Sequence, residues 1–172
     1  MTPKLRVGSI AFGASLAADF VSKRLVSHFL TYTDKYEIIP GFFYLTHVRN
    51  PGAAFGLFSD GDPLVRIWFF VIVSVLAIGI ILSFFRQLAP GDRLHAFALG
   101  LILGGAVGNL IDRLWLHEVV DFLHIKLWGG YSWPDFNFAD SFIVIGVALL
   151  ILELLAAEGE KRASPEPGES TR

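Results

Sequence analysis

Four long apolar stretches alternate with shorter polar segments along the chain. They cover residues of about 5–30, 64–85, 94–113 and 138–157, and each is near the ~20 residues that a helix needs to cross a bilayer. The pattern predicts four transmembrane helices in a single domain over residues 1–157. Residues 158–172 contain Gly, Ser, Pro and charges without apolar periodicity, which predicts a disordered tail.

The first apolar stretch has two possible fates. It follows a basic start at Lys4 and Arg6 and in that respect resembles a secretory signal peptide. It is longer than a removable signal, however, and carries Asp19 and Lys23 in its second half. We therefore expect it to be retained as the first spanning helix.

The loop between the first two predicted helices has the composition of a hairpin. Aromatic and β-branched residues in Tyr36–Ile39 and Phe42–Val48 flank Pro40-Gly41, which predicts two short strands and a turn. The small residues of the next segment, Asn50–Gly56, allow close backbone approach by a partner or substrate, and equally suit an ordinary turn. The predicted fold class is a membrane all-α protein, with four transmembrane helices and a small extracytoplasmic β-hairpin, or cradle, between the first and the second.

Four spans place both termini on one side of the membrane, but the basic residues do not decide which side. Of the 14 Lys and Arg residues, half fall on the terminal side and half on the side of the two long loops. The first helix often dominates orientation, and its leading end carries Lys4 and Arg6. We therefore expect both termini and the tail to be cytoplasmic.

Composition narrows the possible functions. The chain is 53% hydrophobic, has a formal net charge of -2 and contains no cysteine, so disulfides, thiolate nucleophiles and cysteine metal sites are excluded. The Lys and Arg residues are scattered and do not alternate with aromatic residues. This distribution argues against a nucleic acid partner.

Two aspartates lie against the apolar stretches. Asp121 lies in Val119–Phe122, just after the third predicted helix, and Asp140 lies in Phe136–Ser141, at the start of the fourth. Carboxylates beside hydrocarbon are costly, so they suggest a relay, a ligand site or catalysis. Both are expected at the same depth, where a converging pair could act as acid and base.

The third and first predicted helices carry further polar candidates. Small residues at intervals of four on the third helix favour close helix packing; they are Ala96, Gly100, Gly104 and Gly108. The ridge leads to a polar tip, either a structural hydrogen-bonded knot or part of the chemistry, made of Asn109, Asp112 and Arg113. Asp19 and Lys23 share a face of the first helix, where they form either a buried ion pair or a direct part of the site.

Two other functions stay open at this stage. His117–Asp121 approximates a zinc-protease helix motif with ligands at i and i+4, and His124 is a possible third ligand. This alternative leaves Asn137 and Asp140 without a role. Membrane carboxylates also line proton and ion pathways, so a small proton or ion carrier is the second alternative, although the chain lacks the paired broken-helix repeats of common transporters.

Four blocks of sequence, in order, resemble the lipoprotein signal peptidase (signal peptidase II) family: Asn50–Phe55, Gly104–Arg113, Val119–Phe122 and Phe136–Ser141. The resemblance implies a multi-pass aspartic endopeptidase of the bacterial inner membrane. Such an enzyme removes signal peptides from diacylglyceryl-modified prolipoproteins by cutting before the lipidated cysteine of the substrate. The expected partners are these substrates and membrane lipid, and we expect a monomer with neither metal nor cofactor.

The resemblance also assigns roles to individual residues. Asp121 and Asp140 match the catalytic dyad, near the outer face of the membrane. The remaining matches are expected to support the site or bind substrate; they are Asn50, Asn109, Asp112, Arg113, Asn137, Asp19 and Lys23.

Overall fold

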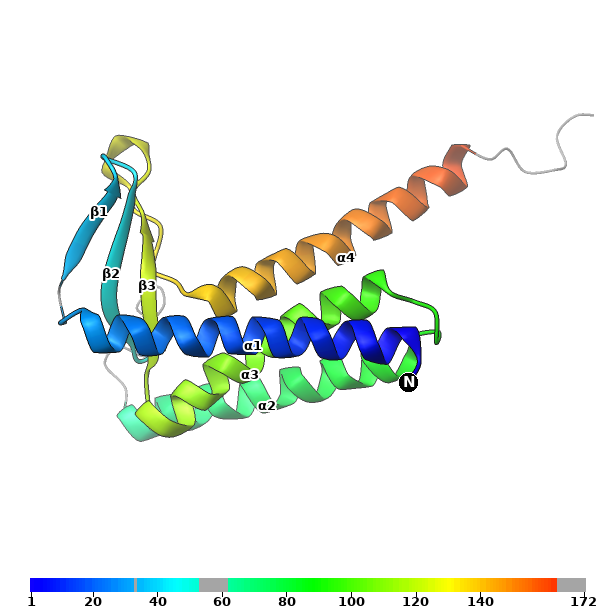
Figure 1. Cartoon of the computed structure of the whole chain (residues 1–172), viewed down its shortest axis with the longest axis horizontal. Helices are drawn as coiled ribbons and strands as arrows, with labels where there is room; N and C mark the ends of the chain where they lie inside the picture. The colour runs from blue at the N-terminus through cyan, green and yellow to red at the C-terminus, as the bar shows by residue number, and fades with distance from the viewer. Residues whose placement is uncertain (33, 53–61, 164–172) are drawn as a thin grey trace, which may run out of the picture.

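In the computed structural model, the described part of the chain forms four long helices and one small antiparallel sheet (Figure 1). The structure describes residues 1–32, 34–52 and 62–163. The helices are α1 (Pro3–Phe29), α2 (Pro63–Gln87), α3 (Leu94–Leu116) and α4 (Phe138–Ala163). All four are long and apolar enough to cross a membrane, as predicted, and the first three lie within three residues of their predicted bounds at either end.

The fourth helix is longer than its apolar pattern predicts. The prediction of a disordered tail from residue 158 is wrong for residues 158–163, because α4 continues to Ala163. The charged residues that end the apolar stretch, Glu and Lys among them, are good helix formers. Hydropathy therefore marks the end of the span, not of the helix. Residues 164–172 of the predicted tail lie outside the described residues.

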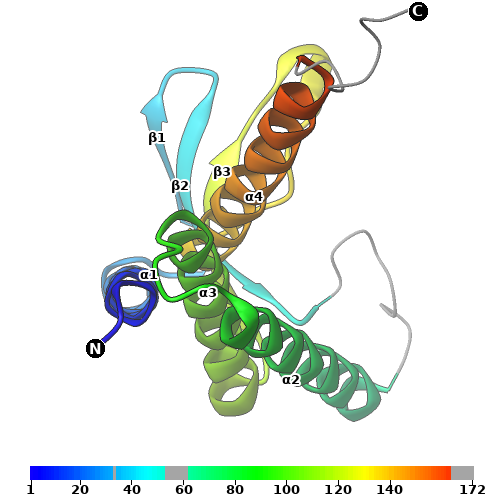
Figure 2. The same cartoon turned by 90° about the vertical axis from the view of Figure 1, so that its right-hand side faces the viewer.

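Helix α3 is the centre of the bundle, and α1, α2 and α4 each pack against it (Figure 2). Its span is 56% buried, against 6% for the span in α2. The small residues allow this packing: a Cβ at Gly104 would collide with Ser15 of α1, and one at Gly105 with the carbonyl of Ala139 in α4. The predicted close approach along this ridge is confirmed.

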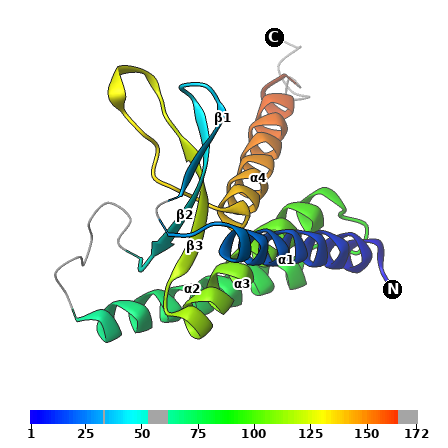
Figure 3. The same ribbon diagram turned by 60° about the vertical axis from the view of Figure 1, so that its left-hand side comes forward.

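The sheet contains β1 (Lys35–Ile39), β2 (Phe43–Asn50) and β3 (Val119–Ile125), in the order β1-β2-β3. The predicted hairpin of the first two strands is confirmed. The third strand, which the sequence pattern did not predict, leaves the end of α3 and runs back beside β2 (Figure 3). Val120 and Phe122 of β3 pack on Val26 of α1. This contact fixes the sheet to the end of the bundle at which α4 begins.

Candidate active site

Asp121 and Asp140 come from different elements and meet at Asn137. Asp121 lies on β3 and Asp140 in the first turn of α4. The side-chain amide of Asn137 donates to Oδ1 of Asp121 (2.7 Å), and its backbone N–H donates to Oδ2 of Asp140 (3.3 Å). The two carboxylates are therefore neighbours on either side of one fully buried residue.

The start of α4 explains the position of Asp140. Oδ1 of Asn137 accepts a hydrogen bond from the backbone N–H of Asp140 (3.0 Å), while the carboxylate of Asp140 accepts from the backbone N–H of Asn137. This reciprocal pair is a capping box, which satisfies two helix N–H groups that would otherwise lack partners. The positive end of the helix dipole also favours a negative charge on Asp140.

Asp121 is held by two amides and almost fully buried. Its exposed fraction is 2%, and its Oδ2 accepts from Nδ2 of Asn50 (2.9 Å). The pairing of β2 with β3 brings Asn50 opposite Val119, two residues from Asp121. Burial raises the pKa of Asp121 to about 7, and the nearby charge of Asp140 acts in the same direction, against the two amide hydrogen bonds.

Gly52, two residues after Asn50, lies where a larger residue would not fit. Gly52 has a left-handed backbone (φ +91°), and a Cβ there would collide with the ring of Phe70 in α2. Its N–H donates to Oδ1 of Asn50 (2.9 Å), which leaves Nδ2 of Asn50 for Asp121. The rest of the predicted small-residue block, 53–56, lies outside the described residues.

A buried cluster behind the two aspartates is centred on Lys23. Its ammonium lies 2.8 Å from Oδ2 of Asp19 and 3.0 Å from Oδ2 of Asp112, and donates to Oδ1 of Asn109 (2.9 Å). Three acceptors match the three N–H bonds of an ammonium. The predicted pair between Asp19 and Lys23 is present, and it extends to two residues of α3, Asn109 and Asp112.

The two acids of this cluster, Asp19 and Asp112, also accept hydrogen bonds from backbone N–H groups of neighbouring elements. Oδ1 of Asp19 accepts from the N–H of Ala139 in the first turn of α4 (2.9 Å), and Oδ2 of Asp112 accepts from the N–H of Val120 in β3 (3.3 Å). The cluster thus ties α1 and α3 to the two elements that carry Asp121 and Asp140.

Asn109 connects the cluster to the aspartates. Because its Oδ1 faces Lys23, its Nδ2 is free to donate to Oδ1 of Asp140, at 2.8 Å. Arg113 lies beside it: the guanidinium donates to the carbonyl of Asn109 (3.2 Å) and lies over the ring of Phe70, 5.6 Å from its centroid. All nine residues that the sequence singled out as site candidates therefore gather at this end of the bundle.

Two contacts of the site were not predicted. Ser74 of α2 lies 3.5 Å from Nη1 of Arg113, and the hydroxyl of Ser141 donates to the carbonyl of Asn137 (2.9 Å). Ser141 was visible only as part of its motif, and Ser74 stands in an apolar run where a serine carries no functional signal.

An apolar cavity of about 360 Å³ opens beside Asp140. Its other lining residues are Trp133, Phe136, Ser141, Val144 and Ile145. Asp140 is partly accessible, whereas Asp121 is buried. A molecule in the cavity would therefore contact the carboxylate of Asp140, whereas the buried carboxylate of Asp121 is not part of the cavity wall.

The predicted zinc motif does not have the required backbone. His117 ends α3 with a left-handed conformation (φ 62°), and Val119–Ile125 is a strand. His117 is the cap of α3 and Asp121 is the third residue of a strand, so the two residues do not share a helix face. In the part of the chain that the structure describes, no group of three His, Cys, Asp or Glu residues could hold a metal ion.

Comparison with known proteins gives consistent matches over most of the chain. The family model described as signal peptidase (SPase) II matches residues 11–156. The lipoprotein signal peptidase of Geobacter metallireducens is 44% identical over 92% of this chain and 96% of its own length, and that of Geobacter sulfurreducens is 42% identical over 94% and 99%.

Two solved structures have the same fold. Both are described as bacterial membrane enzymes solved by the in meso method. One has a TM-score of 0.77 and 32% identity, covering 96% of this chain and 94% of the other. The second has a TM-score of 0.76 and 34% identity, covering 86% and 92%.

Proposed function

The chain belongs to the signal peptidase II family, and from that premise we propose that Asp121 and Asp140 are its catalytic dyad. It is a multi-pass bacterial membrane protease of lipoprotein processing. The observation that carries the dyad is the shared contact with Asn137, which holds both carboxylates at once. Aspartic chemistry needs such a pair, because two adjacent carboxyl groups share one proton.

The two carboxyl groups have different surroundings, which suggests a division of roles. Asp121 is buried and its pKa is raised to about 7, so it holds the shared proton. Asp140 borders the cavity, is partly accessible and accepts from Asn109, so it is the carboxylate that a water in the cavity can reach. In this scheme Asp140 takes a proton from the attacking water. Asp121 polarises the scissile carbonyl and then protonates the leaving amine.

The cavity beside Asp140 supports the proposed substrate. It is lined mainly by apolar residues and opens at the first turns of α4, where that helix begins its span. A prolipoprotein carries its scissile bond next to a lipid anchor, so the bond is held at the membrane surface. We propose that the apolar signal peptide lies against α4 and is cut before the lipidated cysteine, on the outer side of the membrane.

The test is cleavage of a diacylglyceryl-modified prolipoprotein by the purified protein in detergent. Asp121→Asn and Asp140→Asn should each lower the rate by ~10³-fold or more, because each member of a catalytic unit is needed for the whole. Asp92→Asn is the matched control: Asp92 accepts from the N–H of His95 at the opposite end of α3, and its loss should leave the rate within about threefold. A folded Asp121 or Asp140 variant with near wild-type cleavage would refute the dyad.

Asp112 is the nearest other carboxylate and needs its own variant. It contacts Lys23 and the N–H of Val120, which gives it a supporting position. Asp112→Asn should therefore reduce cleavage without abolishing it. Complete loss with Asp112→Asn, combined with activity in Asp140→Asn, would move the catalytic assignment to Asp112.

A further inference from the structure

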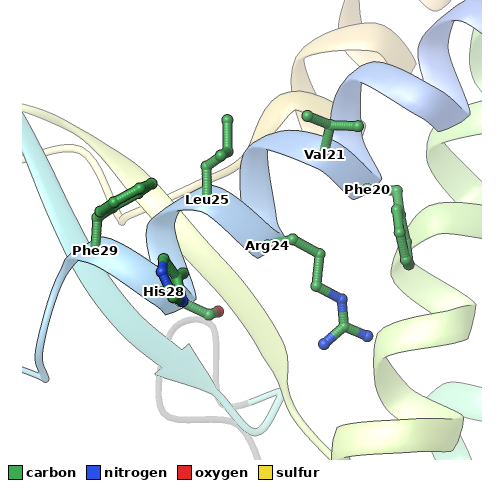
Figure 4. Close-up of a pocket in the computed structure, with 7 residues that line it drawn as sticks. Phe20, Val21, Arg24, Leu25, His28 and Phe29 are labelled. Carbon is green, nitrogen blue, oxygen red and sulfur yellow. The ribbon is translucent and has the colours of Figure 1, made fainter.

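A second hollow lies on α1, at the end of the helix nearest the sheet (Figure 4). It has a volume of about 630 Å³ and is formed by Phe20, Val21, Arg24, Leu25, Ser27, His28 and Phe29, which we call the α1 groove. None of these residues belongs to the cluster of Lys23. The α1 groove is therefore separate from the dyad and its supports.

Arg24 is the charged centre of the α1 groove. Its guanidinium lies 4.5 Å from the ring centroid of Trp115 and 5.1 Å from that of Phe20. Within the described residues, Arg24 has no carboxylate at ion-pair distance, in contrast to Lys23 one position earlier, which has two. Aromatic rings hold a guanidinium by cation–π attraction and leave its N–H edge for an anion.

The surroundings of Arg24 determine which anion can reach it. α1 is a membrane-spanning helix, and Val21 and Leu25 beside Arg24 are 53% and 51% exposed, so this face is in contact with lipid. A charged side chain at this depth is costly without a partner. The phosphate of a phospholipid is the anion present at the membrane boundary, and guanidinium groups bind phosphate with paired hydrogen bonds.

The order of side chains along α1 matches the order of groups in a phospholipid. Ser27 and His28 lie toward the sheet, the polar end of the helix, while Val21 lies one turn deeper than Leu25. Figure 4 shows Arg24 and Phe20 extending from one side of α1 and Val21 and Leu25 from another. Phe20 lies one turn deeper than Arg24 on the same side of α1 and is 42% exposed, so a phosphate at Arg24 would leave an acyl chain along Phe20.

We propose that the α1 groove is a binding site for an anionic phospholipid of the leaflet nearest the sheet. Arg24 binds the phosphate, Ser27 donates a further hydrogen bond to it, and one acyl chain runs along Phe20. The site does not depend on the catalytic assignment.

The test uses native mass spectrometry of the full chain with added phosphatidylglycerol or with diacylglycerol, which has the same chains but no phosphate. The wild type should bind phosphatidylglycerol ~10-fold more tightly than diacylglycerol, and Arg24→Gln should remove most of that difference. Arg24→Lys should retain part of it, because an ammonium keeps the charge but loses the fork. The matched control is Arg86→Gln, an exposed arginine at the opposite end of the bundle, which should bind like the wild type.

Cleavage of prolipoprotein in detergent shows that each variant is folded, because Arg24 has no contact with the dyad or with Lys23's cluster. Equal binding of phosphatidylglycerol by folded Arg24→Gln and wild type would overturn the proposal. So would an equal loss in Arg86→Gln, which would show general attraction to basic residues. Displacement of phosphatidylglycerol by glycerol phosphate at the same concentration would also overturn it, since the apolar part of the α1 groove would then contribute nothing.

Discussion

Asn137 uses every polar atom of its side chain within the site. Its Oδ1 caps α4 through the N–H of Asp140, and its Nδ2 donates to Asp121 and to Asn109 (3.2 Å). Truncation to alanine should have two separable effects. Loss of the cap costs about 1 kcal/mol of stability, whereas misplacement of the carboxylates by even 1 Å can lower a rate by ~10²-fold.

Asp62→Ala separates these effects, because Asp62 caps α2 through the N–H of Leu64 (2.8 Å) and has no part in the site. We expect a small loss in melting temperature for Asp62→Ala and a larger one for Asn137→Ala, because Asn137 is fully buried and its removal leaves Asp121 without one of its donors. Cleavage should fall only for Asn137→Ala. Equal activity in the two variants would mean that Asn137 acts as a helix cap and nothing more.

Burial of Asp121 makes stability depend on pH. The pKa of Asp121 is raised to about 7 in the folded protein, so the folded state binds its proton more tightly than the unfolded state. The resulting stabilisation is fully present below the unfolded pKa near 4 and is lost as pH rises through about 7. Asp121→Asn removes this dependence, because asparagine stays neutral.

Melting temperatures in detergent at pH 5 and pH 8 measure the effect. Relative to the wild type, Asp121→Asn should be more stable at pH 8 than at pH 5, and the change between the two pH values should be absent in Asp62→Asn, whose carboxylate accepts only from a backbone N–H among the described contacts. A constant difference between Asp121→Asn and wild type across this range would show that the Asp121 carboxyl group has an ordinary pKa.

At the scale of residues, the sequence predicted which side chains gather at this end of the bundle better than it predicted their contacts. Asp121 and Asp140 were identified by their cost beside apolar stretches, and the supporting residues through motif resemblance. The bond from Asn50 to Asp121 joins residues 71 positions apart. No local pattern encodes such a pair, because it depends on the register of β2 against β3.

At the scale of elements, helices were predicted closely and one strand was missed. Apolar length alone identifies a spanning helix, whereas β3 is a seven-residue strand whose partner, β2, lies far earlier in the chain. Its β-branched Val119 and Val120 were a signal, but two apolar residues after a helix also fit a continuing helix or loop. The ends of helices were similarly ambiguous, since charged residues end the span of α4 without ending the helix.

Gly105 tests whether α3 sets the position of α4. A Cβ there would meet the carbonyl of Ala139 and lie 2.9 Å from Cγ1 of Ile143, both in α4. Gly105→Ala should therefore push the first turn of α4 away from α3, at a cost of about 1–3 kcal/mol. The dyad would separate, so cleavage should fall more steeply than stability.

Gly79→Ala is the matched control, because a Cβ at Gly79 of α2 meets nothing within 4 Å. It should leave cleavage unchanged and can raise stability slightly, since alanine favours the helix over glycine. If Gly105→Ala had the same melting temperature and cleavage rate as Gly79→Ala, the contact between α3 and α4 would accommodate a methyl group, and the prediction would be wrong.

At the scale of the whole molecule, the sheet and the dyad lie at one end of the bundle, and the turn between α2 and α3 at the other (Figure 1). The orientation of the protein in the membrane therefore decides from which side of the membrane a substrate reaches the dyad. The basic residues Lys4 and Arg6 favour a cytoplasmic N-terminus, which would direct the sheet, the cavity beside Asp140 and the α1 groove to the outer side.

The absence of native cysteine makes this orientation directly measurable, because a single introduced thiol is labelled without background. Lys126→Cys places it at an exposed position just after β3, and Gly91→Cys at an exposed position in the turn before α3. A membrane-impermeant maleimide should label Lys126→Cys in intact spheroplasts and Gly91→Cys only after permeabilisation. The reverse pattern would put the dyad in the cytoplasm. Since we propose cleavage on the outer side of the membrane, that result would contradict the proposed site of cleavage even if the two aspartates proved essential.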